Sequence, residues 1–164
     1  MSDATSREIE RRFLVDEPPG HLERFPQEKI RQGYLAIADD GAEVRVRQES
    51  GRFLLTLKNG QGLVRAEDER EISPALFAAL WPLTRGRRIR KVRYVIPHDA
   101  LTIQLDVYRR KLEGLLVAEI EFPDEETARL FRAPAWFGRE ITGDADDRNQ
   151  SLAVRGLPGS SDRL

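Results

Sequence analysis

Cysteine is absent from this 164-residue chain, which also has only two histidines and one methionine. Without cysteine there can be no disulfide, no thiolate nucleophile and no sulfur-ligated zinc. Neither His21 nor His98 has a histidine partner at metal-ligand spacing, so we expect both at the surface. No apolar run reaches the roughly 18 residues of a membrane-spanning helix, and no signal-like segment is found. These absences predict a soluble, cytoplasmic protein with no membrane partner.

Net charge is also nearly absent, because 27 Lys and Arg residues oppose 28 Asp and Glu residues to give −1. Nucleic-acid-binding domains usually carry a basic excess, so we expect no nucleic-acid partner. Charged residues nevertheless make up 34% of the chain, above the roughly 25% usual in soluble proteins. Many acids and bases therefore share one body, which we expect to be a single domain over residues 1–164.

Most of the chain has the composition of β-strands. Short connections at 39–41 and 49–52 predict hairpins, and hence antiparallel neighbours. Helices are predicted after the cap residues Ser73 and Asp124, and over about 146–155. Eight segments are rich in β-branched, aromatic and leucine residues and are bounded by Gly, Pro or Asp. These candidate strands are 7–15, 29–37, 42–50, 52–59, 64–72, 87–97, 101–109 and 115–122.

The first of these strands separates charged from apolar side chains. Period-2 alternation places Glu8, Glu10 and Arg12 on one face and mostly apolar residues on the other. Two interpretations stay open: the charged rows face water around an apolar barrel interior, or they face inward around a ligand. Like charges repeated on one face repel each other, and the predicted helices need an apolar outer surface to cover, so both features favour the second. The alternation returns in 43–47, 65–71, 91–93 and 119–121.

Sorting the charged rows by sign suggests the ligand. Arginine forks bind phosphate oxygens bidentately and lysine adds a point charge, so the basic rows suit a polyanion with several phosphoryl groups. Their members are Arg12, Arg45, Arg47, Lys58, Arg65, Lys91 and Arg93. The acidic rows supply hard oxygen ligands of the kind that Mg²⁺ and Mn²⁺ prefer. Their members are Glu8, Glu10, Asp106, Glu119 and Glu121, with Glu67 and Glu69 as further candidate acids of the same interior.

A basic cradle beside a carboxylate metal site is the minimum apparatus for phosphoryl or nucleotidyl transfer. At this point the opening segment Glu8-Ile9-Glu10-Arg11-Arg12 resembles the ExExK signature of the CYTH superfamily, the triphosphate tunnel metalloenzymes, with arginine in the last place. Further segments match short bacterial-type members in family order, which makes the resemblance far more specific than the first motif alone. Over about residues 7–155 they are 32–35, 44–47, 55–58, 65–72, 90–94, 114–121 and 134–144.

The resemblance implies a mainly β (α+β) fold: an eight-stranded antiparallel closed barrel around a hydrophilic tunnel, with a few helices packed outside and a C-terminal helix. It implies that the basic rows bind a triphosphate, that the acidic rows bind Mg²⁺ or Mn²⁺, and that Lys91 positions or activates the attacking water. Two positions depart from the family. Arg12 replaces the usual lysine, and residues 146–149 read Asp-Asp-Arg-Asn in place of Arg-Tyr-x-Asn, which puts the contacts of the C-terminal helix in doubt.

We therefore predict a divalent-metal-dependent triphosphatase, with inorganic tripolyphosphate as the first substrate. A class IV adenylyl cyclase is the second prediction, but that branch carries a His-Phe pair ahead of ExExK, and residues 1–7 have none. Thiamine triphosphate is a third substrate, although no aromatic slot for its organic head is evident. Outside the enzymes, a sensor that binds polyphosphate or nucleotide is the alternative. A missing metal carboxylate would favour the sensor, and none is missing.

Overall fold

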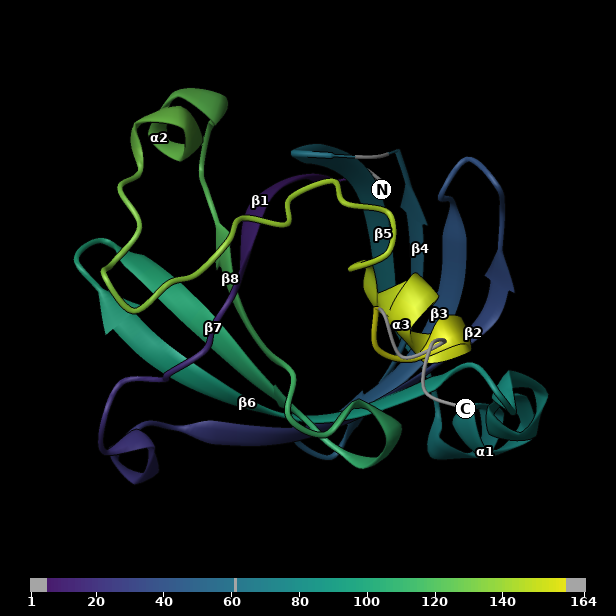
Figure 1. Ribbon diagram of the computed structural model, residues 1–164. Coiled ribbons are helices and arrows are strands. Elements are labelled where there is room, and N and C mark those ends of the chain that lie inside the picture. The colour runs from purple at the N-terminus through teal and green to yellow at the C-terminus, as the bar shows by residue number, and fades with distance from the viewer. Residues whose placement is uncertain (1–5, 61, 159–164) are drawn as a thin grey trace.

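A computed structural model of the chain describes residues 6–60 and 62–158. Its strands form a closed barrel in which every neighbouring pair is antiparallel, in the order β1-β5-β4-β3-β2-β6-β7-β8, with β8 pairing back to β1 (Figure 1). The strands are β1 (Ser6–Leu14), β2 (Gln27–Ile37), β3 (Glu43–Glu49), β4 (Arg52–Asn59), β5 (Val64–Glu71), β6 (Arg88–His98), β7 (Leu101–Tyr108) and β8 (Leu116–Glu121).

The eight predicted strands and the predicted closed barrel are confirmed. The sequence located the strands well because period-2 alternation is a local signal, and tight turns punctuate it. Ser50 and Gly51 make the β3–β4 turn with φ angles of 46° and 78°, and Gly41 has φ of 87° before β3. Such left-handed conformations favour glycine, which explains its place at two of these corners.

Three α-helices occur in the described residues, at the positions expected. They are α1 (Pro74–Leu80), α2 (Glu125–Leu130) and α3 (Asn149–Arg155), accompanied by the short 3₁₀ turns η1 (Leu22–Arg24), η2 (Trp81–Thr84) and η3 (Arg110–Leu112). The Ser73 Oγ accepts a hydrogen bond from the Leu76 amide at 3.1 Å, and Asp124 Oδ1 accepts one from the Thr127 amide at 2.7 Å. Both predicted cap residues therefore satisfy amides that the helix leaves free. None of the described helices is long and apolar enough to span a membrane.

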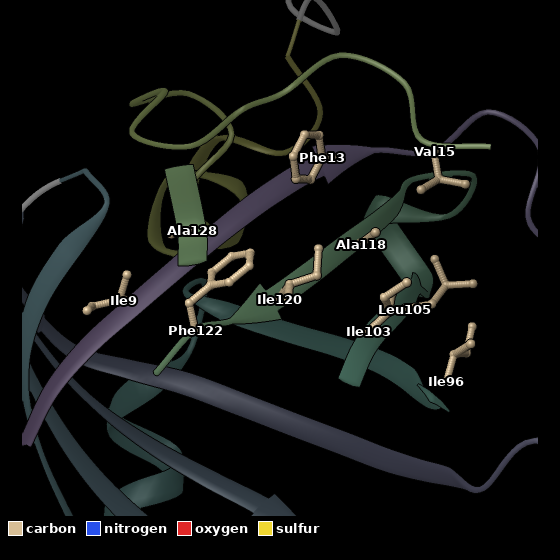
Figure 2. Close-up of a cluster of buried hydrophobic side chains, with 10 residues drawn as sticks. All are labelled: Ile9, Phe13, Val15, Ile96, Ile103, Leu105, Ala118, Ile120, Phe122 and Ala128. Carbon is tan, nitrogen blue, oxygen red and sulfur yellow. The ribbon is translucent and has the colours of Figure 1, made fainter. Parts of the chain in front are cut away.

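The larger apolar core lies outside the barrel wall. Figure 2 shows Ile9 and Phe13 of β1 beside Ile120 of β8 and Ala128 of α2. The outward faces of β6 and β7 add Ile96, Ile103 and Leu105. On the opposite side of the barrel α1 covers β4 through Phe77, which is buried against Phe53 (Figure 1). Because the helices bury the outer faces, the inner faces of the strands are free to carry charge.

A second, smaller core occupies one end of the barrel interior. There Leu152 and Ala153 of α3 pack with Tyr34, Ile89 and Tyr108, all buried. Helix α3 contacts β2 and β6 at this end. The barrel interior is thus divided into an apolar end beneath α3 and a charged remainder, which forms the cavity described next.

A charged cavity inside the barrel

The charged interior is a cavity of about 250 Å³, and no aliphatic or aromatic residue of 6–60 or 62–158 is in its lining. Strands supply most of the lining through every second residue, and the segment entering α3 supplies the rest. The lining residues are Glu8, Glu10, Arg12, Glu28, Gln32, Glu43, Arg45, Arg47, Glu49, Lys58, Arg65, Glu67, Glu69, Lys91, Arg93, Gln104, Glu119, Glu121, Arg148 and Asn149.

All seven predicted basic residues line this cavity, as do the predicted acids with the exception of Asp106. The candidate acids Glu67 and Glu69 also line it, whereas Glu71 is exposed and pairs with Arg52. Asp106 is completely buried behind the lining, where its carboxylate contacts the side chains of Lys91 and Arg93.

Several lining residues were missed from the sequence. Glu28, Gln32, Glu43, Glu49 and Gln104 sit at the same alternating positions as the predicted residues, so the period-2 signal was available for all of them. Arg148 and Asn149 carried no such signal, because they lie at the start of a helix and reach the cavity only through its docking against the barrel.

Ion pairs hold most of the wall together. Lys58 Nζ lies 2.6 Å from Glu8 Oε2 and 2.8 Å from Glu67 Oε2, and is buried between them. Arg47 pairs with Glu69 at 2.9 Å and with Glu49 at 3.3 Å. These contacts follow from strand register, since Lys58 is directly opposite Glu67 on β5. Opposite charges at facing positions stabilise the sheet.

Several arginine N–H groups in the cavity wall nevertheless have no partner. Arg12 Nη2, Arg45 Nε and Arg65 Nε are buried without a hydrogen-bond acceptor in the part of the chain that the structure describes. An unpaired buried donor costs roughly 1–3 kcal/mol, more if charged. Arginines with unpaired donors in the wall of a cavity are suited to bind an anion.

Two carboxylates of β1, Glu8 and Glu10, are buried close to other negative charges. Burial, reinforced by neighbouring Glu10, raises the pKa of Glu8 to about 8 despite its contact with Lys58. Burial and Glu119 likewise raise the pKa of Glu10. Glu10 also faces Glu121 directly across the β1–β8 ladder, a like-charge pairing that destabilises a sheet. By contrast, burial of Glu119 is outweighed by Arg93, Lys91 and Arg12, which lower its pKa below the usual range. The cavity thus has an acidic spot at Glu8, Glu10 and Glu121.

The acidic spot is not a preformed metal cage. Among residues 6–60 and 62–158, no three Asp, Glu, His or Cys side chains are grouped closely enough to hold an ion by themselves. The carboxylates present are nevertheless hard oxygen donors, and Glu10 makes no side-chain hydrogen bond or ion pair with any described residue. Mg²⁺ is usually held by one or two carboxylates together with water and substrate phosphates, so this donor set fits that ion chemically.

The C-terminal helix α3 contacts the barrel even though residues 146–149 depart from the family sequence. Arg12 Nη1 donates to the Asp147 carbonyl at 2.9 Å, and Gln150 Nε2 donates to the Gly41 carbonyl at 3.2 Å. The Tyr108 hydroxyl donates to Asn149 Oδ1. Arg12 therefore reaches the segment before α3 while also contributing to the lining of the cavity.

Comparison with known proteins gives a consistent result. An inorganic triphosphatase of Nitrosomonas europaea is 43% identical over 150 residues, covering 90% of this chain and 97% of that protein. An inorganic triphosphatase of Acetivibrio thermocellus is 35% identical, covering 89% and 92%. A crystal structure of an inorganic triphosphatase superposes with a TM-score of 0.67 at 39% identity, covering 93% of this chain and 97% of that one. No family model matches the sequence.

A closed antiparallel barrel around a charged cavity, together with the superposed structure, places this protein among the barrel-shaped triphosphatases. The chain belongs to the inorganic triphosphatase family, to whose members it aligns over nearly its full length.

Proposed function

We propose that this protein hydrolyses inorganic triphosphate inside the barrel cavity. The observation that carries this proposal is the composition of the cavity wall, which combines eight Lys and Arg side chains with carboxylates and, among the described residues, has no aliphatic or aromatic residue. A triphosphate is charged along its whole length, so each of its phosphoryl groups can bind Lys or Arg side chains of this wall. An adenine or thiamine ring would gain nothing from it, because neither stacking partners nor apolar contacts line this space.

The phosphate-binding role falls to the arginines with unpaired donors. Arg12, Arg45 and Arg65 line the cavity and each has an N–H without a hydrogen-bond partner among the described residues, and their nearest carboxylates are at 3.4–3.8 Å. Arg47, Lys58 and Arg93 complete the predicted set; each is paired closely with a carboxylate, at 2.6–2.9 Å, and Arg47 Nε also has no hydrogen-bond partner among the described residues. A bound triphosphate would compete for these paired cations and would satisfy the unpaired donors outright.

A divalent ion, Mg²⁺ or Mn²⁺, would be held by Glu10 and Glu121 with help from Glu8 and Glu119. The raised pKa values of Glu8 and Glu10 support this assignment, because a nearby cation would relieve the repulsion that raises them. When bound, the ion would neutralise charge on phosphoryl oxygens. The carboxylates orient it, and the arginines hold the triphosphate so that a water can attack in line.

Lys91 is our candidate for positioning or activating this water. Burial lowers the pKa of Lys91 to about 8, although the carboxylate of Asp106 opposes the shift. A lysine with a pKa this close to neutral pH can give up and take back a proton during the reaction. We further infer that the chain forms a single catalytic domain and belongs, with the inorganic triphosphatases, to the CYTH superfamily.

Phosphate release from tripolyphosphate, ATP and thiamine triphosphate, each assayed with Mg²⁺, Mn²⁺ or EDTA, tests the proposal. We expect turnover of tripolyphosphate with a divalent ion, much slower turnover of the two organic triphosphates, and none with EDTA. Comparable rates on all three substrates would contradict the role of the polar wall. Tight binding of tripolyphosphate without turnover would make the protein a sensor instead.

Replacement of a single carboxylate tests the metal assignment. Glu10→Gln removes one charge from a site that depends on few protein ligands, so we expect a folded protein whose activity falls by a factor of about 10² or more. Titration of activity with Mg²⁺ measures the effect, and Glu113→Gln, at an exposed glutamate, is the matched control. Wild-type activity of Glu10→Gln at limiting Mg²⁺ would refute the assignment.

A further inference from the structure

We propose that Asp106 is a positioning residue that holds Lys91 and Arg93 in the cavity wall, and that it is not a metal ligand. The inference rests on the proposed function, since it concerns how the same cavity handles triphosphate. It departs from the metal-binding role that the family resemblance implies for this aspartate.

Both oxygens of Asp106 are already engaged. Its Oδ2 accepts from Lys91 Nζ at 2.5 Å and from Arg93 Nη2 at 2.8 Å, while Oδ1 accepts from Arg93 Nε at 2.7 Å. The bidentate geometry with Arg93 is the strongest arrangement available to a carboxylate and a guanidinium. A metal ion would have to displace one of two cations from a completely buried carboxylate. Displacement would leave a buried lysine or arginine without its partner, which is strongly destabilising.

The layering of the three side chains supports the same assignment. Lys91 and Arg93 line the cavity, whereas Asp106 stands behind them in the wall. The arrangement follows from register, because Arg93 on β6 is directly opposite Asp106 on β7. By comparison, Glu10 and Glu121 lie in the lining itself, where an ion can reach them. Asp106 is therefore poorly placed for metal and well placed to support the cations.

The hydrogen bond to Asp106 uses only one of the N–H donors of Lys91. An ammonium group has three N–H donors, and Lys91 donates one of them to Asp106 while lying over the Tyr108 ring at 5.6 Å. No other hydrogen bond from Lys91 to a described residue is found. Two donors thus remain for phosphoryl oxygens or water. Fixing a flexible lysine at one point orients these donors, and misplacing a reacting group by about 1 Å can cost about 10² in rate.

Asp106→Asn tests the inference because it keeps the size of the side chain and removes its charge. We expect kcat for tripolyphosphate to fall by about 10- to 100-fold, with KM unchanged or lower, because the cavity gains positive charge while Lys91 loses its anchor. The Mg²⁺ concentration for half-maximal activity should stay within about threefold of wild type. Glu10→Gln is the metal-site comparison and should raise that concentration.

A metal-binding role would give the opposite pattern. If Asp106→Asn raises the Mg²⁺ requirement as Glu10→Gln does, and saturating Mg²⁺ restores kcat, the inference is overturned. If Asp106→Asn alone fails to fold, Lys91→Met and Lys91→Met/Asp106→Asn are compared instead. A positioning role predicts that the second substitution then changes kcat by less than about threefold, because the lysine it positions is already absent.

One readout does not depend on turnover, so failure of the proposed function and failure of this inference can be told apart. The chain has four lysines, Lys29, Lys58, Lys91 and Lys111, so NMR of ¹³C-labelled lysine gives few signals and Lys91→Arg identifies the relevant one. In Asp106→Asn we expect the Lys91 side-chain signal to sharpen as the side chain becomes mobile. A Lys91 signal that stays as broad as in the wild type would overturn the inference, whatever the protein hydrolyses.

Discussion

Two buried cations of the barrel, Arg45 and Lys91, differ in what faces them. Arg45 has an unpaired N–H in the cavity wall and contacts Glu43 at 3.4 Å, whereas Lys91 is held at 2.5 Å by a carboxylate behind the wall. The first arrangement suits binding of a phosphoryl group that does not react. The second suits a group that must be held at a defined point during the reaction.

Two substitutions separate these roles. We expect Arg45→Ala mainly to raise KM, by about 10- to 100-fold, the equivalent of roughly 1.5–3 kcal/mol for a charged hydrogen bond. Lys91→Ala should mainly lower kcat. Steady-state kinetics with tripolyphosphate measures both parameters. Equal losses of kcat in the two variants, with KM unchanged, would contradict the division, and a loss of binding alone in Lys91→Ala would move Lys91 to the phosphate-binding set.

Glu8 makes the stability of the metal-free protein depend on pH. Burial and Glu10 raise its pKa from 4.5 to about 8, so the folded state holds this proton more tightly than the unfolded chain. The contribution to stability is therefore complete below pH 4.5 and is lost as the pH rises through about 8. We expect the free energy of unfolding, measured with urea in EDTA, to fall over this window and Glu8→Gln to fall less. A stability that rises from pH 5 to pH 8 would exclude this account.

At the scale of elements, alternation predicted the strands and the caps predicted the helices. Strand β5 is the hardest case for this local signal: Glu67 and Glu69 line the cavity, but six of the seven residues Arg65–Glu71 are acidic or basic, and they occupy both faces of the strand. Which face points inward could not be read from β5 alone. That choice came from the apolar outer faces of β1, β7 and β8, which α2 and the following segment cover (Figure 2).

One close contact between elements depends on glycine. A methyl group on Gly33 in β2 would lie 2.4–2.8 Å from the Thr84 side chain of η2, which is buried against it. Overpacking of this kind costs about 1–3 kcal/mol. We expect Gly33→Ala to lower the free energy of unfolding by that amount, measured by urea denaturation. Gly20→Ala is the matched control, because no atom lies within 4 Å of its added methyl. Equal stability of the two variants would show that η2 shifts freely.

At the scale of the whole molecule, strands from both ends of the chain form one cavity. Tripolyphosphate should stabilise the fold, because it binds the folded cavity and has no comparable site on the unfolded chain. At 100 times its Kd the gain would be about 2.7 kcal/mol. We expect a rise in Tm with tripolyphosphate in EDTA, where hydrolysis is blocked, and little rise with sulfate at equal ionic strength. Equal shifts with both anions would mean general charge screening.

The sequence by itself determined the eight strands, the helix starts, the charged inner rows and most of the basic and acidic cavity residues, because alternation and capping act over a few neighbouring residues. Tertiary structure alone decided the partners. Arg12 and Glu119 meet only because β8 closes the barrel on β1. Asp106 is bonded to two cations behind the wall, and α3 brings Arg148 and Asn149 into the cavity. Such contacts join residues far apart in the chain, so no local pattern records them.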